Sequence, residues 1–241
     1  MHYPEHLKKA VLAKAKDLPL EGFVEGQGPQ QPKVMLIGEA PGKEEIKENV
    51  PFIGRSGQLL MEQLQQVGLS RETVYITSAV RSRPFSVKTK QIAKTGERVT
   101  KFPNRTPTKE EIKIFAPLLD WEIAVCQPEL ILTLGNIGLQ RLLGPKPTIT
   151  AVHGTVIQSP IQTFDEQSQN YHWTQKTYQI IPLFHPAAVF YNYRLKEVVK
   201  EDWQVVQKQL QLLKKVSSLP KTKTYGLINK RKSFILKGAL K

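Results

Sequence analysis

The chain has 241 residues, 40% of them hydrophobic and 23% charged, and its 35 lysines and arginines exceed its 21 acidic residues to give a net charge of +14. The length favours one folded domain, and no apolar run approaches the roughly 20 residues that span a bilayer, which excludes a membrane-spanning protein. The positive surplus attracts polyanions, so nucleic acid is the expected partner; contact with anionic membranes or the ribosome is the alternative.

The first predicted elements alternate between strand and helix. Residues 33–37 form a short apolar run that ends at a glycine, as in a strand buried on both faces. Residues 56–68 carry apolar side chains at helical spacing and stop at a glycine. Residues 73–77 form a second strand, which opens into the polar segment 78–84.

The middle of the chain continues this alternation after an interruption. Residues 85–107 are polar and basic without periodicity, which predicts a long basic surface loop, with its basic part at 86–103. A capping box at 108–111 starts a helix that runs to about Val125. A third buried strand follows at 129–135, and then a short helix at 138–143.

The last third adds two strands, a helix and a tail. Strands are expected at 155–158 and 177–183, and apolar spacing over 195–213 predicts a long amphipathic helix. The segment 216–241 is rich in lysine and contains no acidic residue, which indicates a mobile basic tail. Strands that alternate with helices predict an α/β protein whose parallel sheet is covered on both faces.

In such sheets, ligands bind beyond the carboxyl ends of the strands. Three predicted loops meet there, at 38–57, 78–84 and 185–193, so residues far apart in sequence can form one pocket. The first loop contains Gly38-Glu39-Ala40-Pro41-Gly42, which places a carboxylate between glycines that let backbone amides approach a ligand. An ordinary strand-to-helix turn is the alternative. The segment is neither a dinucleotide fingerprint nor a phosphate-binding loop.

Four segments in order carry a more specific signal: Gly38-Glu39-Ala40-Pro41-Gly42, Pro51-Phe52-Ile53-Gly54-Arg55-Ser56-Gly57, Val74-Tyr75-Ile76-Thr77 with Arg83-Pro84, and His185-Pro186. Further matches are Asn104-Arg105-Thr106-Pro107, Leu134-Gly135 and His153-Gly154. Together they resemble the family 4 uracil-DNA glycosylases over residues 33–213. The resemblance implies a three-layer α/β/α sandwich with a central, mainly parallel sheet, forming a glycosylase domain over 1–215.

The resemblance also implies a role for each matching residue. Glu39 would orient a water and stabilise positive charge on the sugar, and neutral His185 would donate a hydrogen bond to uracil O2. The residues implied to contact the base are Gly38, Ala40, Phe52, Ser78 and His185, with Phe52 stacking on it. The residues implied to contact DNA are Arg55, Ser56, Arg83, Ala187 and Tyr191.

Each of these roles has a structural alternative. Glu39 can be a carboxylate at a helix start, Phe52 a core aromatic, and His185 a core histidine with internal partners. The aromatic residues Phe190, Tyr191 and Tyr193 resemble the family's loop that wedges into the minor groove, and they can instead simply pack. The basic loop and the tail can contact phosphates or remain solvated.

Two departures from the family pattern qualify the resemblance. The family usually holds an iron–sulfur cluster on four cysteines, whereas Ser82 and Phe115 stand at two of those positions and the only cysteine, Cys126, matches none of the four. We therefore predict no metal and no cofactor. The family usually has an asparagine where this chain has Ser78, and a hydroxyl reads a base edge less completely than an amide.

The expected function is hydrolysis of the N-glycosidic bond of uracil, or a related deaminated base, flipped out of DNA for base-excision repair. A catalytically weak or inactive nucleic-acid-binding protein on the same fold is the alternative, and an enzyme acting on free nucleotides is a third. The N-terminus carries lysines where an export signal has an apolar core, so we expect a cytoplasmic protein. We also expect a monomer that does not bind membranes.

Overall fold

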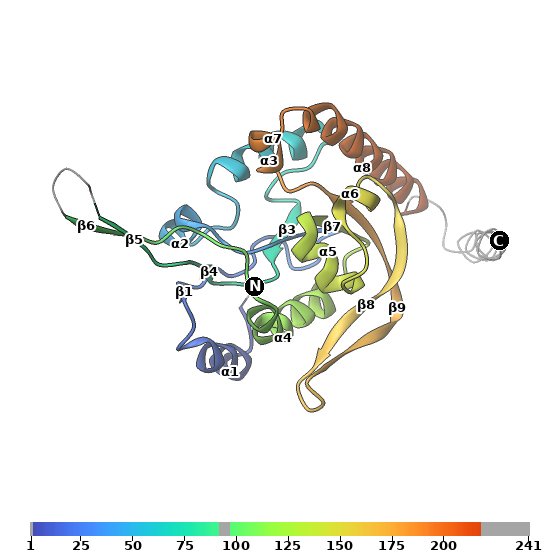
Figure 1. Ribbon diagram of the computed structural model, residues 1–241. Coiled ribbons are helices and arrows are strands. Elements are labelled where there is room, and N and C mark those ends of the chain that lie inside the picture. The colour runs from blue at the N-terminus through green and yellow to red at the C-terminus, as the bar shows by residue number, and fades with distance from the viewer. Residues whose placement is uncertain (1, 92–96, 218–241) are drawn as a thin grey trace.

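A central sheet of five strands organises the structure, a computed structural model that describes residues 2–91 and 97–217. In spatial order the strands are β3 (Val74–Ser78), β2 (Val34–Gly38), β7 (Leu130–Leu134), β9 (Asn170–Leu183) and β8 (Ile157–Asp165). Neighbouring strands are parallel except for β8, which pairs antiparallel with β9 at the edge. Helices lie on both faces, so the predicted three-layer sandwich with a mainly parallel sheet is confirmed (Figure 1).

One face of the sheet is covered by α3 (Arg55–Gln66) and α8 (Leu195–Ser217). Alternate side chains of β2, including Leu36, point to this face and pack in one apolar cluster with Leu60 of α3 and Trp203 of α8. All three are buried, and burial of such a side chain contributes about 1.5 to 3 kcal/mol. This packing fixes α3 against the sheet, with the N-terminus of the helix near the ends of β2 and β3.

The other face is covered by α4 (Lys109–Cys126) and α5 (Gly135–Leu143). The intervening β2 residues, Met35 and Ile37, pack there against apolar side chains of both helices. At the start of α4, the predicted capping box is present: the Glu111 amide donates to the Thr108 hydroxyl at 3.2 Å, and the Thr108 amide donates to the Glu111 carboxylate at 2.8 Å.

An aromatic cluster joins the N-terminal segment to α4. It contains Tyr3, Phe23, Phe115 and Trp121, with neighbouring ring centroids 5.5 to 6.4 Å apart. Helix α1 (Glu5–Ala15) contributes Val11 and Ala15 to the same apolar region. Phe115 is fully buried in this cluster.

A buried polar network lies beside the aromatic cluster. The Glu122 carboxylate pairs with the Arg81 guanidinium and accepts hydrogen bonds from the Tyr3, Tyr75 and Thr77 hydroxyls. Arg81 and Glu122 are almost completely inaccessible to solvent. Loss of one partner from such a pair leaves an uncompensated buried charge and typically costs about 3 to 5 kcal/mol. The network therefore joins the N-terminal segment, β3 and α4.

Two hairpins differ from the sequence prediction. The segment predicted as a loop contains an antiparallel pair, β5 (Lys88–Gln91) and β6 (Arg98–Lys101), which projects from the body of the protein (Figure 1). That loop prediction is wrong because every residue of these strands except Val99 is exposed, so no apolar alternation marks them. Strands β8 and β9 extend well beyond the predicted segments 155–158 and 177–183; most of the added residues of β9 are exposed, and those of β8 are nearly all half-buried, so neither carries a clear apolar alternation.

The remaining elements are short: β1 (Leu20–Glu21), α2 (Lys43–Glu48), β4 (Arg83–Pro84), α6 (Ile149–Val152) and α7 (Ala188–Tyr191). Strand β1 pairs antiparallel with β4. Among the described residues, no helix combines the length and apolar character needed to cross a membrane. Of the predicted basic tail at 216–241, all but the last two residues of α8 lies outside the described residues.

Candidate active site

A cavity of about 420 Å³ opens at the carboxyl edge of the sheet, where β2 lies between β3 and β7. Gly38 and Ser78 are register partners at the ends of β2 and β3, so the loops after these strands start side by side. The lining residues come from segments 40–45 and 51–56, with Val24, Glu25, Thr77, Ser78, Asn104, His185, Ala187 and Tyr191. The structure thus places eight predicted site residues around one cavity: Ala40, Phe52, Arg55, Ser56, Ser78, His185, Ala187 and Tyr191. Gly38, Glu39 and Arg83 are not among its lining residues.

Phe52 has a strained backbone conformation. Its φ of 54° lies in the left-handed region, which costs a bulky residue about 1 to 3 kcal/mol and persists only where the surroundings enforce it. The Arg71 guanidinium does so by donating at 2.8 Å to the carbonyl oxygens of both Pro51 and Phe52. Gly57 permits the same conformation, since a Cβ there would lie 1.9 Å from the Phe52 carbonyl oxygen. Strain of this kind is concentrated at ligand sites.

The Phe52 ring lies between the strand end and His185. A Cβ on Gly38 would lie 2.6 Å from the ring, so glycine is required there to admit the aromatic side chain. The ring centroids of Phe52 and His185 are 6.0 Å apart. Phe52 also belongs to the apolar core cluster, so it fills the core and lines the cavity at once.

Glu45, which the sequence interpretation missed, joins the two ends of the cavity loop. One carboxylate oxygen accepts from the Gly42 amide at 3.0 Å, and the other accepts from the Ile53 and Gly54 amides at 3.1 and 2.9 Å. Glu45 stands three residues after the glycine that precedes α2, which is the spacing of a capping glutamate and a signal available in the sequence. This carboxylate holds the residues that follow Phe52.

Replacing Glu45 by glutamine should lower the free energy of unfolding by about 1 to 3 kcal/mol, because the three amides lose a charged acceptor and one of them faces an NH₂ donor. Urea titration followed by circular dichroism measures this change. The matched control is Glu48→Gln, at the exposed end of α2, which should stay within about 0.5 kcal/mol of the wild type. Equal stabilities of the two variants would contradict the role of Glu45.

The hydrogen bonds of His185 determine its tautomer. The Ala187 amide donates to Nδ1 at 3.2 Å, so in the neutral ring the proton is on Nε2. Desolvation lowers the pKa of His185, and the Glu45 carboxylate opposes this to a smaller extent, so the imidazole is neutral at pH 7. Gly135 has a φ of 83°, and a Cβ added there would lie only 3.3 Å from the His185 Cβ, so glycine lets the turn after β7 lie close to His185. The cavity therefore contains an oriented neutral N–H donor.

Glu39 is half-buried beside the cavity, between Gly38 and Ala40. Its carboxylate accepts a hydrogen bond from the Thr106 hydroxyl. Burial raises the pKa of Glu39, and this hydrogen bond lowers it by a smaller amount. The result is a desolvated carboxylate next to the cavity, held by the segment that also supplies Asn104 to the lining.

Ser78 and Asn104 are the uncharged polar side chains placed to meet a ligand edge. Ser78 is only 6% exposed, and its hydroxyl lies 3.5 Å from the position of a Cβ on Gly38. Asn104 was missed as a site residue, although it belongs to a segment that carries the family resemblance. Its carbonyl oxygen accepts from Arg83 Nε, which leaves the amide NH₂ as the donor end.

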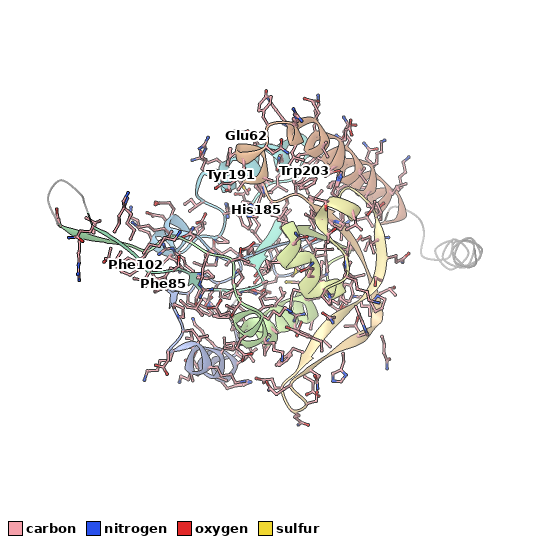
Figure 2. The ribbon with its side chains drawn as sticks, viewed as in Figure 1. Glu62, Phe85, Phe102, His185, Tyr191 and Trp203 are labelled. Atoms are coloured by element: carbon pink, nitrogen blue, oxygen red, sulfur yellow. The ribbon has the colours of Figure 1, made fainter. Side chains whose placement is uncertain are left out.

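The lining of the cavity also includes basic, acidic and aromatic side chains, among them Arg55, Glu44 and Tyr191. Arg55 and Ser56 are the first residues of α3, whose N-terminus favours anions. The Arg55 guanidinium stacks on Phe190 at 4.2 Å. Tyr191 (Figure 2) is 91% exposed and Tyr193 is 76% exposed, so neither side chain is packed in the core.

Arg83 has internal partners, in contrast to its predicted contact with DNA. Its side chain is only 6% exposed, pairs with Glu21, and donates to the Phe102 carbonyl and the Asn104 side chain. A guanidinium used in this way anchors the base of the β5–β6 hairpin and is not presented to a phosphate. Likewise, only Ser78 from the predicted 78–84 loop lines the cavity.

The residues present do not fit an iron–sulfur cluster. Four thiolates are needed, and the chain has one cysteine, Cys126. Burial raises the pKa of Cys126 to about 12, so it remains a thiol, packed against the sheet from the last residue of α4. Ser82 and Phe115 are buried. Within the described ranges, no three His, Cys, Asp or Glu side chains are grouped to hold a metal ion.

Comparison of the sequence with known proteins finds similarity to uracil-DNA glycosylases. A sequence profile of the uracil DNA glycosylase superfamily matches residues 25–207. The chain is 31% identical to a type-4 uracil-DNA glycosylase of Sulfurisphaera tokodaii over 76% of this chain and 73% of that protein. It is 32% identical to type-4 uracil-DNA glycosylases of Saccharolobus solfataricus (78% and 76% covered) and Thermotoga maritima (80% and 83% covered).

Proposed function

The chain belongs to the uracil DNA glycosylase superfamily, and from this membership we infer that it is a DNA glycosylase of base-excision repair. We propose that it hydrolyses the N-glycosidic bond of uracil, or of a related deaminated base, after that nucleotide is flipped out of DNA. The observation that carries this proposal is the pairing of Phe52 with His185 in one cavity: an aromatic face for a base lies beside a neutral N–H donor.

The proposed mechanism assigns one task to each group. The extruded base stacks on Phe52, and the His185 Nε2–H donates to uracil O2, where negative charge develops as the bond from C1′ to N1 breaks. The Glu39 carboxylate stabilises the positive charge on the sugar and orients the attacking water. The water oxygen forms the new bond to C1′, its proton passes to solvent, and the base departs as an anion that is protonated afterwards.

The direct test is base release from single-lesion oligonucleotides. Uracil should be released from a deoxyuridine strand, and scission should appear only after alkali, as expected of a glycosylase without lyase activity. Strands with hypoxanthine or xanthine in place of uracil define the substrate range. Salt-sensitive binding without release from any of these strands would favour the alternative of an inactive nucleic-acid-binding protein, for which the loss of the family asparagine at Ser78 is the main argument.

Replacing Ser78 by asparagine should raise kcat/KM for uracil by about 5-fold to 100-fold relative to hypoxanthine, because a paired donor and acceptor discriminates a base edge by about 1 to 3 kcal/mol. Competition between two differently labelled strands measures this ratio. The matched control is Ser78→Leu, which has the same number of side-chain heavy atoms and the same branching as asparagine but no polar group, and should lose activity on both bases. If wild type and Ser78→Asn had the same ratio of kcat/KM for uracil to kcat/KM for hypoxanthine, Ser78 would have no role in base recognition.

We further propose that residues 1–215 act as one glycosylase domain, as a cytoplasmic monomer, with 216–241 as a basic extension. The buried network from Tyr3 to Glu122 supports including the N-terminal segment in the domain. Sedimentation with and without a DNA strand tests the monomer.

A further inference from the structure

A second hollow, of about 690 Å³, opens at the base of the β5–β6 hairpin. Its lining includes Arg83, Phe85, Lys101 and Phe102. Lys43, the first residue of α2, lines both this hollow and the candidate active site, so the two are neighbours on the surface. We call the second hollow the hairpin groove. Figure 2 shows Phe85 and Phe102 close together where the hairpin leaves the body of the protein.

The hairpin groove contains an exposed aromatic ring whose position is fixed by contacts with neighbouring side chains. Phe102 is 51% exposed, and its ring meets the ring of Phe85 edge to face, with centroids 5.7 Å apart. The buried Arg83 guanidinium lies 6.0 Å from the Phe85 ring centroid and donates to the Phe102 carbonyl oxygen. An exposed ring that is fixed in this way can receive a planar ligand with little loss of side-chain freedom.

The hairpin is also strongly basic. Lys88 and Lys101 are directly opposite each other in the antiparallel pair, and Lys90 follows Lys88 on the same face. Like charges at opposed positions destabilise a strand pair, so this arrangement favours an anion near the two ammonium groups. A polyanion whose units carry planar rings fits both the charges and the exposed aromatic side chain.

We propose that the hairpin groove is a second nucleotide subsite for the lesion-bearing strand. An unpaired base near the extruded nucleotide stacks on Phe102, and Lys43 and Lys101 contact the phosphates between the two. The identity of this strand rests on the proposed glycosylase function. Both faces of a base inside a duplex are covered by its neighbours, so stacking on Phe102 requires single-stranded or locally opened DNA. The groove therefore selects lesions with unpaired neighbours.

The test compares Phe102→Ala with the wild type on a labelled single strand that contains no lesion and on the same sequence as a duplex. The expected dissociation constant for the single strand rises about 5-fold to 100-fold, the range for loss of one base–aromatic stack. The duplex value should change less than 2-fold. Phe102→Trp should bind the single strand as tightly as the wild type, because it keeps a stacking face.

The matched control is Trp173→Ala, an exposed aromatic residue of β9 that is 53% exposed and lines neither cavity. It should bind both DNAs normally, and thermal unfolding of all variants should coincide with the wild type. Wild-type affinity of Phe102→Ala for the single strand, or an equal loss on the duplex, would overturn the subsite. If Phe102→Ala weakens single-strand binding while the wild type releases no base, the glycosylase proposal fails and the nucleotide subsite remains.

Discussion

His185→Ala should reduce kcat for uracil release by about 100-fold to 1000-fold, the loss measured when one preorganised donor to a developing anion is removed. The reason lies in the hydrogen bonding of the ring: the Ala187 amide donates to Nδ1, which leaves Nε2–H as the available donor. The donor acts mainly on the departing base, so KM should change little. Single-turnover measurement with excess protein isolates this step.

A matched control separates this role from a general effect of losing an imidazole. His172→Ala removes a histidine whose side chain is 57% exposed on β9, far from the cavity lining, and should retain wild-type kcat. His185→Gln keeps an amide donor and should recover part of the rate. Wild-type turnover by His185→Ala would exclude the histidine from the chemical step.

Glu39→Gln should reduce kcat by about 100-fold, because the amide cannot stabilise positive charge on the sugar. The substitution keeps an oxygen that can accept the Thr106 hydroxyl, so the local hydrogen bond survives while the charge is removed. Thr106→Val removes the hydrogen bond to Glu39 but keeps the charge of the carboxylate, and it should retain most of the activity. If Thr106→Val were the more damaging of the two, Glu39 would be a structural carboxylate.

The same two residues predict how activity depends on pH. Glu39 must be ionised, and burial raises its pKa above the usual 4.5, so activity falls on acidification at a higher pH than for an exposed glutamate. His185 must be neutral, and its lowered pKa means that it protonates only below 6.5. Protonation of either group should therefore reduce activity as the pH falls. The residual activity of Glu39→Gln should keep only the limb that belongs to His185.

The core of this fold could be predicted because its central strands are short and mostly apolar. Strands β2, β3 and β7 are buried along their full length, and glycine or a capping box marks the helix boundaries beside them. The position of the site followed from the same pattern, since the carboxyl ends of parallel strands converge. The aromatic at Phe52 and the imidazole at His185 were accordingly expected in one pocket, and both line the cavity.

The features that could not be predicted depend on exposure or on distant partners. The β5–β6 hairpin has no apolar face, so neither its strands nor the groove at its base leaves a periodic signal. The resemblance to the glycosylase family implied that Arg83 contacts DNA. Its burial depends on Glu21 and the Phe102 carbonyl, which lie 62 and 19 residues away in sequence.

The cluster of Tyr3, Phe23, Phe115 and Trp121 holds the N-terminal segment against α4 through contacts between aromatic rings. The hydrogen bond from the Tyr3 hydroxyl to Glu122 adds a polar contact, and none of these interactions uses a metal ligand. Peroxide and chelators, which dismantle cysteine-held centres, have no such target in this chain. The packing of the N-terminal segment in this architecture therefore does not depend on bound iron.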